Sequence, residues 1–188
     1  VEGIYRDVTQ RKNLERELQR LATTDMLTGM TNRRAFLDLA ERTYAQARRQ
    51  GASMCLLMLD LDHFKSVNDR YGHLEGDRVL VAFAQAVREQ LRGSDTVGRL
   101  GGEEFCVLLP QTGTASATEV ATRILEGTRA MRLATVAGEA FGITVSIGLA
   151  TLLAPDQSLH QLLDRADQSL YSAKRSGRER GVLAGVFG

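Results

Sequence analysis

The chain has 188 residues, the usual length of one compact domain, and 43% of them are hydrophobic, which is enough for a buried core. Its 24 basic and 23 acidic residues leave a formal net charge of +1, and this even balance argues against a nucleic acid polymer as a partner. No apolar stretch reaches the roughly 20 residues that cross a bilayer. There is also no signal peptide, so we expect no direct membrane contact for this part of the protein.

The two cysteines, Cys55 and Cys106, both lie within apolar runs. Such a pair provides neither a disulfide framework nor the spacing of a metal site, so we interpret them as reduced thiols in the core of a cytoplasmic domain. Because the chain begins with Val1 and not with Met, we expect it to be part of a longer protein. The sequence leaves open whether that protein is anchored in a membrane.

The first 23 residues differ in character from the rest of the chain. Residues 1–8 (VEGIYRDV) are predicted to be the end of a strand from an upstream domain. Residues 9–23 are charged and helical, with Leu14, Leu18 and Leu21 at spacings of four and three. This spacing is typical of a helix that pairs with a second helix. Packing of the same leucines against their own domain is the alternative.

The remaining chain alternates between helical and strand-like patterns. Thr31 or Asn32 is expected to cap a helix that ends at Gly51. The other predicted helices are a short one ending at Tyr71, a long one that includes residues 79–91, and two at 114–131 and 158–176. The predicted strands are 53–59, 96–100, 104–109, 141–152 and 181–187, with a glycine-containing turn that joins the second and third into a hairpin. This order predicts an α+β fold with a mixed sheet covered by helices.

Two acidic clusters lie beside these strands. Asp60 and Asp62 come just after strand 53–59, and residues two apart in an extended chain can share a face. Glu103 and Glu104 lie at the tip of the hairpin. Carboxylates that are held close together repel each other unless a cation lies between them, and Mg²⁺ prefers oxygen ligands from carboxylates and substrate phosphates. The pattern therefore indicates a possible metal site, with two solvated acidic turns as the alternative.

Several short motifs together resemble one known family. The string RLGGEEF at residues 99–105 closely resembles the signature of the GGDEF family, the diguanylate cyclases, in its GGEEF form. The further matching segments are DMLTG at 25–29, NRR at 32–34, DLDHFK at 60–65, ND at 68–69, YGH at 71–73, GD at 76–77, SIG at 146–148, AD at 166–167, Tyr171, AK at 173–174 and GR at 177–178. They run from about residue 25 to residue 181 in the family's order and spacing. The resemblance implies a ferredoxin-like βαββαβ core, as in the palm of nucleotidyl cyclases and polymerases.

The resemblance also implies an activity. The family condenses two GTP molecules into cyclic di-GMP and releases pyrophosphate, with Mg²⁺ (or Mn²⁺) as the cofactor. Each 3′-hydroxyl attacks the α-phosphate of the other GTP, a displacement that depends mainly on positioning and charge neutralisation. Because one protomer holds one GTP, a homodimer is expected. The alternative is a catalytically silent domain that binds GTP or cyclic di-GMP, although such members usually lose acidic residues that this chain retains.

The metal ligands implied by the resemblance are Asp60, the backbone carbonyl of Leu61, and Glu103. Glu103 is also expected to help deprotonate the 3′-hydroxyl. Asp62 and Glu104 are further candidates for the same ion.

The implied guanine site consists of Asn68 and Asp77, with His73 nearby. A carboxylate at Asp77 accepts hydrogen bonds from the N–H groups of guanine and repels the ring nitrogen of adenine, so GTP is expected over ATP. For Asp77, capping of a helix start is the alternative.

The implied triphosphate site consists of Lys65, Lys174 and Arg178, together with backbone N–H groups around His63 and Phe64. Lys65 is also the implied catalytic cation. Lys174 and Arg178 are four residues apart near a predicted helix C-terminus, so they can face the same way. A favourable interaction with the helix end is the alternative for both.

A second ligand site is implied upstream of the hairpin. Arg92 and Asp95 form an Arg-x-x-Asp pattern, with Asp95 six residues before Gly101, and Arg123 lies on the following predicted helix. At this offset the pattern resembles the family's inhibitory product site, where arginine grips phosphate and guanine. Feedback inhibition by cyclic di-GMP is therefore expected.

The start of the chain completes the predicted organisation. The segment GIYRDVTQRK at residues 3–12 resembles the tail of a PAS sensory domain and its helical exit. We therefore predict a PAS remnant at 1–8, a linker or signalling helix at 9–23, and the cyclase domain at 24–188.

Overall fold

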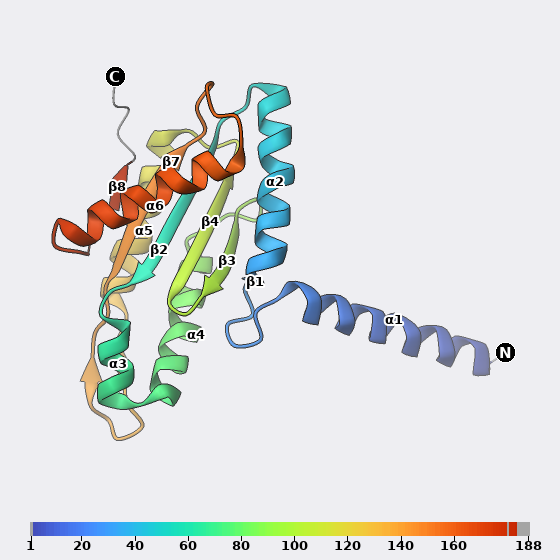
Figure 1. The fold of residues 1–188 in the computed structure, drawn as a ribbon. Coiled ribbons are helices and arrows are strands. Elements are labelled where there is room, and N and C mark those ends of the chain that lie inside the picture. The colour runs from blue at the N-terminus through green and yellow to red at the C-terminus, as the bar shows by residue number, and fades with distance from the viewer. Residues whose placement is uncertain (1, 180, 184–188) are drawn as a thin grey trace.

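The computed structural model describes residues 2–179 and 181–183 (Figure 1). A six-stranded sheet in the order β1-β3-β4-β2-β7-β8 forms its centre. The strands are β1 (Thr31–Asn32), β2 (Met54–Leu61), β3 (Thr96–Gly101), β4 (Glu104–Pro110), β7 (Val145–Thr151) and β8 (Gly181–Leu183), and β5 (Leu133–Ala134) pairs with β6 (Ala140–Phe141) in a separate hairpin. The helices are α1 (Glu2–Thr23), α2 (Arg33–Gln50), α3 (Phe64–Tyr71), α4 (His73–Glu89), α5 (Thr114–Ala130) and α6 (Leu159–Arg175).

The connections between the central strands confirm the predicted α+β, ferredoxin-like architecture. Strand β2 leads through α3 and α4 to the β3–β4 hairpin, and α5 then leads to β7, which gives the βαββαβ order. The pairs β3–β4, β4–β2 and β2–β7 are antiparallel, whereas β1 and β8 add to the two edges in parallel. Strand β2 therefore lies between two partners along its whole length.

Strand β2 divides the core into two halves, because its alternate residues point to opposite faces of the sheet. Leu57 and Leu59 belong to the cluster formed with α3, α4 and α5, and Leu56 and Met58 belong to the cluster formed with α2 and α6. Figure 1 shows these helices on the two faces of the sheet. By this alternation, Asp60 lies on the face that α2 and α6 cover.

Most predicted boundaries are confirmed, with two exceptions in the sheet. Asn32 caps α2 through a hydrogen bond from the N–H of Ala35, and Gly51 ends this helix in a left-handed conformation. The prediction that β2 ends at Leu59 is wrong, because the strand continues through Asp60 and Leu61. The reason is that the backbone of Asp60 pairs on both sides of the ladder whatever its side chain.

The second exception is the predicted strand 141–152, which is two elements. Only Val145–Thr151 joins the main sheet, and Phe141 belongs to the β5–β6 hairpin. Two-residue strands are too short to produce an alternating pattern, so this hairpin has no signal in the sequence. Residues 184–187 of the predicted last strand lie outside the described residues, whereas Gly181–Leu183 form β8.

The N-terminal segment differs from its prediction. Residues 2–8 are not a strand end but the first part of α1. A helix satisfies its backbone hydrogen bonds within the segment, whereas a strand needs a partner strand beside it. Leu14, Leu18 and Leu21 are 63%, 57% and 45% exposed, and α1 extends away from the sheet (Figure 1), so the alternative that these leucines pack on their own domain is wrong. In the part of the chain that the structure describes, no helix is long and apolar enough to cross a membrane.

Helix α6 comes closest to the sheet at Gly148 in β7. A Cβ atom at this position would lie 2.1 Å from the carbonyl oxygen of Ala166 and 2.2 Å from the backbone nitrogen of Leu170. Both atoms belong to the backbone of α6, so a side chain at residue 148 would push the helix away from the sheet.

We therefore predict that Gly148→Ala lowers the free energy of unfolding by about 1–3 kcal/mol, the usual cost of overpacking. Urea denaturation followed by circular dichroism measures this change. Gly127→Ala in α5 is the control: a Cβ atom there would lie 3.6 Å from Gln90 Nε2, an ordinary contact, and alanine should stabilise the helix by about 1 kcal/mol. Equal stability of the Gly148→Ala variant and the unmodified protein would show that the backbone of α6 does not lie this close to residue 148.

Candidate active site

The end of β2 brings a buried carboxylate next to a cation from α6. Asp60 is buried, and its Oδ2 atom lies 2.8 Å from Nζ of Lys174. In the sheet, Asp60 is opposite Glu104 in β4 and opposite Ser146 in β7. The N–H of Leu61 donates to the carbonyl of Glu103 at 3.4 Å, so the strand end and the hairpin turn lie side by side.

The charges around Asp60 act on one another. Burial raises the pKa of Asp60 above its usual value. Lys174 opposes this rise, whereas the negative charges of Glu103 and Glu104 add to it. The ionised carboxylate is therefore stabilised less than it would be in water, even with Lys174 beside it.

These carboxylates are suited to Mg²⁺, although they do not form a complete set of ligands. Among residues 2–179 and 181–183, no group of three or more His, Cys, Asp or Glu side chains has a geometry that could hold a metal ion. Carboxylate oxygens are nevertheless the donors that Mg²⁺ prefers, and this ion commonly takes its remaining ligands from water and substrate phosphates. Asp60 and Glu103 thus fit a metal site that a nucleotide would complete.

Asp62, a further candidate ligand in the sequence, is used differently. It is buried, and its two carboxylate oxygens accept hydrogen bonds from the hydroxyls of Thr144 and Ser146 and from the N–H of Glu179. These contacts leave its oxygens engaged within the protein, so the expectation that Asp62 helps to hold a metal is not supported.

The predicted guanine residues lie on two consecutive helices. Asn68 belongs to α3, and its Oδ1 atom lies so close to Gly76 in α4 that a Cβ atom there would be 1.9 Å away. Asp77 follows Gly76 and is exposed. Because α4 begins at His73, Asp77 is beyond the first turn, and the helix-capping alternative for this residue is wrong.

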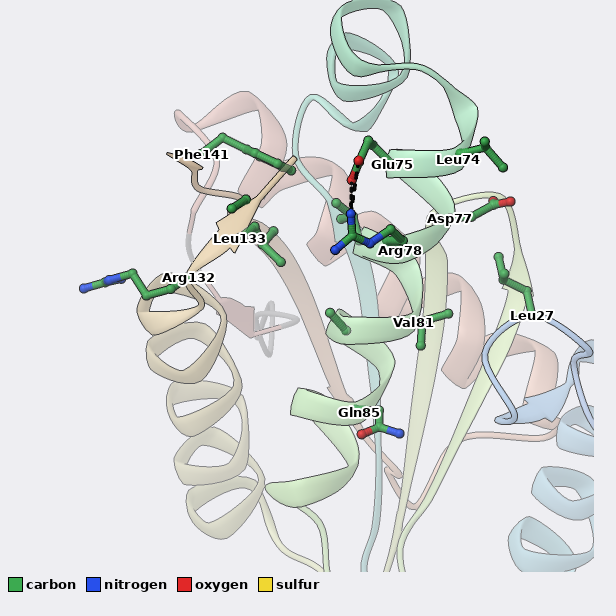
Figure 2. A pocket seen from close by; sticks show the side chains of 13 residues that line it. Leu27, Leu74, Glu75, Asp77, Arg78, Val81, Gln85, Arg132, Leu133 and Phe141 are labelled. Atoms are coloured by element: carbon green, nitrogen blue, oxygen red, sulfur yellow. Dashed lines mark hydrogen bonds and ion pairs between the residues drawn. The ribbon is translucent and has the colours of Figure 1, made fainter. Parts of the chain in front are cut away.

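Asp77 also lines a hollow of about 640 Å³ along α4. Figure 2 shows Asp77 and Leu27 on one side of this helix, and the ion pair between Glu75 and Arg78 on the other. Glu75 is buried and also accepts a hydrogen bond of 2.9 Å from the N–H of Val136, so α4 is connected to the loop of the β5–β6 hairpin.

The predicted phosphate residues lie around the end of β2. His63 has a left-handed backbone (φ 57°) and makes no side-chain cap to α3, which leaves the first N–H groups of this helix open to an anion. Phe64 is buried in the core and Lys65 is exposed. Lys174 forms an ion pair with Asp60. This pair is its main contact, rather than the interaction with the helix end that was the alternative.

Arg178 is not placed as the sequence predicted. Helix α6 ends at Arg175, and Arg178 lies in the following turn with φ 62°. The helical spacing of four residues therefore does not apply to Lys174 and Arg178. The Gly177 that ends the helix is the signal in the sequence that was given too little weight.

The Arg-x-x-Asp pattern forms a second hollow of about 480 Å³. Arg92 and Asp95 line it, and the backbone N–H of Arg92 donates to Asp95 at 2.9 Å. Arg123 is not among its lining residues; its side chain donates to the carbonyl of Gln90, two residues before Arg92. Arg88, which the sequence did not single out, lies in the last turn of α4 and also lines the hollow.

Arg99 holds the tip of the β3–β4 hairpin. Its Nε and Nη2 atoms donate to the carbonyl of Gly102 at 3.0 and 2.8 Å, and its Nη1 atom donates to both carboxylate oxygens of Asp25. Burial raises the pKa of Asp25, but hydrogen bonds from Thr28 and Arg99 outweigh it and hold the pKa below its usual value. Both residues lie within quoted motifs, yet sequence reasoning gave neither a role.

Comparison with known proteins gives a consistent result. Residues 22–180 match the family described as "Diguanylate cyclase, GGDEF domain". The diguanylate cyclase DgcP of Pseudomonas aeruginosa is 43% identical over 175 residues, which are 92% of this chain and 25% of that protein. The diguanylate cyclase DgcM of Escherichia coli is 38% identical over 181 residues, which are 96% of this chain and 43% of that protein.

Two solved structures are similar over almost the whole chain. The coiled coil and GGDEF domain of DgcB from Caulobacter crescentus, in complex with c-di-GMP, matches with a TM-score of 0.90 at 33% identity and covers 97% of this chain and 95% of that one. The diguanylate cyclase SiaD of Pseudomonas aeruginosa, in complex with its activator SiaC, matches with a TM-score of 0.83 at 39% identity and covers 97% and 71%.

The chain thus has the fold and the sequence of a nucleotidyl-cyclase-type domain, and it belongs to the GGDEF diguanylate cyclase family. It spans a quarter of DgcP and less than half of DgcM.

The raised pKa of Asp60 leads to a prediction about stability. Because ionising Asp60 is unfavourable in the folded state, Asp60→Asn should have a higher Tm than the unmodified protein at about pH 7. The difference should shrink as the pH falls towards the usual pKa of aspartate, where Asp60 is neutral in both states. Thermal unfolding between about pH 3 and pH 8 measures it.

Asp156→Asn is the matched control. Burial raises the pKa of Asp156, but hydrogen bonds from Arg165 and the N–H of Leu153 lower it more, so its pKa is below the usual value. Its ionised form therefore stabilises the fold, and Asp156→Asn should lower the Tm at about pH 7. The prediction for Asp60 is wrong if both variants lower the Tm alike.

The contacts of Arg99 lead to a third prediction. Lysine keeps the charge but cannot reach the Gly102 carbonyl and Asp25 together, so Arg99→Lys should lower the free energy of unfolding by about 1–3 kcal/mol. Hydrogen exchange at the Gly102 and Glu103 amides should also become faster. Arg33→Lys is the control, because Arg33 makes one 3.4 Å contact with the neighbouring Leu100 carbonyl. Unchanged exchange in Arg99→Lys would contradict the assignment.

Proposed function

We propose that this domain is a diguanylate cyclase, which condenses two GTP molecules into cyclic di-GMP and releases two pyrophosphates. The observation that carries the proposal is the meeting of Asp60, the Glu103 turn and Lys174 at one end of β2. These groups come from three separate elements and supply both carboxylates and a cation. Metal-assisted transfer of a nucleotidyl group requires this combination.

The carboxylates in this proposal have separate tasks. Asp60, Glu103 and the carbonyl of Leu61 would hold Mg²⁺ or Mn²⁺, which supplies a positive charge to the phosphates when bound. Glu103 accepts the proton of the attacking 3′-hydroxyl. Its position in the turn, next to the Gly102 carbonyl that Arg99 holds, supports this role, because a base needs a fixed position.

The cations and the helix start bind the triphosphate. Lys174 neutralises Asp60 in the absence of nucleotide and can exchange this partner for a phosphate oxygen. Lys65, on the first turn of α3, and Arg178, in the turn after α6, add positive charge. The backbone N–H groups of His63, just before α3, and of Phe64, its first residue, supply further donors to the anion.

Guanine is recognised by Asn68 and Asp77, with His73 at the start of the same helix. Asn68 packs against Gly76, the residue that precedes Asp77 in α4. A carboxylate and an amide together match the N–H groups and the carbonyl of guanine, and a site built on such bonds strongly rejects a base that lacks them. GTP is therefore the substrate, rather than ATP.

The active unit is a homodimer in which two sites face each other. The exposed Leu14, Leu18 and Leu21 on α1 support pairing with α1 of a second copy. The related DgcB structure includes a coiled coil and bound c-di-GMP, which supports the same arrangement and a product-binding site here. A PAS-like sensory domain would precede α1. The free, buried Cys55 and Cys106 support a cytoplasmic location.

Turnover gives a fourth prediction. Purified protein incubated with Mg²⁺ and GTP should produce cyclic di-GMP, detected by chromatography, whereas ATP in the same assay should not be consumed. Glu103→Gln should reduce turnover by about 100-fold or more with an unchanged Tm, because it removes the base and a metal ligand. Glu119→Gln, on the exposed face of α5, is the control.

Two outcomes decide between this function and the alternative. Full activity in Glu103→Gln would contradict the assigned base. Binding of GTP without any product in the unmodified protein would favour the catalytically silent domain, which the retention of Asp60, Glu103 and Glu104 argues against.

Regulation gives a fifth prediction. Arg92 and Asp95, which line the second hollow, bind cyclic di-GMP as an inhibitor together with Arg123, whose side chain exchanges the Gln90 carbonyl for the ligand, and Arg92 supplies the contact to phosphate. In Arg92→Ala, added cyclic di-GMP should no longer inhibit turnover, so the inhibition constant should rise by about tenfold or more. Initial rates at increasing product concentration measure this. Arg42→Ala on the exposed face of α2 is the control, and unchanged inhibition in Arg92→Ala would contradict the site.

A further inference from the structure

The turn after α6 has an unusual backbone. Arg178 and Glu179 have φ angles of 62° and 49°, in the left-handed region that residues other than glycine, asparagine and aspartate rarely adopt. Two such residues in succession cost free energy and persist only where the surrounding contacts hold them. This turn carries Arg178, which the proposed function assigns to the triphosphate.

The contact that joins this turn to the sheet comes from Asp62. The N–H of Glu179 donates to Oδ2 of Asp62 at 3.1 Å, across 117 positions in the sequence. At its outer side the turn is held by Arg129, whose Nε atom donates to Glu179 Oε1 at 2.7 Å. The Arg129 and Glu179 side chains are 68% and 39% exposed, so their pair contributes less than a buried contact does.

Asp62 is itself held in place from β7 and the segment before it. The hydroxyl of Ser146 donates to Oδ1 and that of Thr144 to Oδ2, both at 2.8 Å, and the N–H of Asp62 donates to the carbonyl of Thr144 at 2.9 Å. Asp62 is only 5% exposed. A buried carboxylate that accepts from two hydroxyls, on a residue whose own N–H is also bonded, is a rigid acceptor for the Glu179 N–H.

The geometry also relates Asp62 to Asp60. The two carboxylates are two residues apart, and both contact the end of α6 or the turn after it: Asp60 contacts Lys174, and Asp62 contacts Glu179. If Lys174 leaves Asp60 to bind a phosphate, the Asp62–Glu179 contact still connects β2 to this segment. The segment can then exchange one partner without losing its position.

We propose that Asp62 is a positioning residue that holds the 177–179 turn in its left-handed conformation, so that Arg178 and Lys174 are presented to the triphosphate. It acts through the backbone of Glu179 and not as a metal ligand. The proposal concerns the same site as the proposed function and rests on it.

The first test needs no ligand. In Asp62→Asn, a neutral amide oxygen replaces the ionised carboxylate as the acceptor of the Glu179 N–H and binds it more weakly, so hydrogen exchange at the Glu179 amide should become about tenfold faster. Asp156→Asn is the matched control, since Asp156 is a second buried carboxylate, bonded to Arg165 near the other end of α6. It should lower the Tm without changing exchange at Glu179. Unchanged exchange in Asp62→Asn would overturn the proposal.

The second test measures the site by calorimetry in the Glu103→Gln background, so that GTP is not consumed. Asp62→Asn should weaken GTP binding by about tenfold, whereas the affinity for guanosine, which has no phosphates, should stay the same. Equal GTP affinity with and without the Asp62 change, or an equal loss for GTP and guanosine, would overturn the proposal.

Thr144→Val covers the case in which Asp62→Asn does not fold. It removes one donor that fixes Asp62 and should weaken GTP binding by a few-fold with unchanged guanosine affinity; equal GTP affinity would again count against the proposal. If the Glu103→Gln protein with Asp62 intact binds no GTP at all, the proposed function fails. The hydrogen-exchange experiment alone then decides whether Asp62 holds the turn.

Discussion

The ion pair between Asp60 and Lys174 is the interaction around which the rest of the site is arranged. A carboxylate at a buried strand end is unfavourable by itself, as its raised pKa indicates, and two glutamates beside it add further negative charge. A protein that needed only a stable sheet would place an apolar residue there. The fold tolerates this position because α6 brings a lysine to it. Much of the domain can be understood as the means of placing that helix.

Three features place it. Gly148 lets the backbone of α6 approach β7 closely. The buried Asp156, which lies before the start of the helix, binds Arg165 of α6 through two nitrogens. Beyond its end, Asp62 holds the Glu179 N–H. The cation is thus positioned by contacts at the beginning, the middle and the end of one element, none of which touches a reacting atom.

Local signals in the sequence predicted the fold well. The cap at Asn32, the stop at Gly51 and the apolar run before Asp60 each have a local physical cause, and each was found at or within two residues of its predicted place. The ferredoxin-like order followed from the family resemblance rather than from these patterns. The β5–β6 hairpin and β1 were missed, because two-residue strands depend on tertiary contacts that no local pattern records.

The geometry of the candidate site was predicted only in part. Motif positions led to Asp60 and Lys174, which form an ion pair, and to Asn68, which packs against Gly76. The errors arose where a side chain's role depends on distant segments: Arg178 lies outside its helix, and Asp62 is engaged by β7 and the turn after α6. Such pairings across the chain cannot be read from spacing.

The junction between α1 and the domain has a mechanical consequence. Asn32 Nδ2 donates to the carbonyl of Ala22, a β-bridge joins Thr24 to Thr31, and Asp25 binds Arg99. Because these contacts join the end of α1 to the sheet, the junction is stiff and does not act as a hinge. A change in the tilt of α1 would therefore rotate the whole domain as a rigid body. In the homodimer proposed above, such a change would alter the separation of the two domains while leaving the interior of each undisturbed.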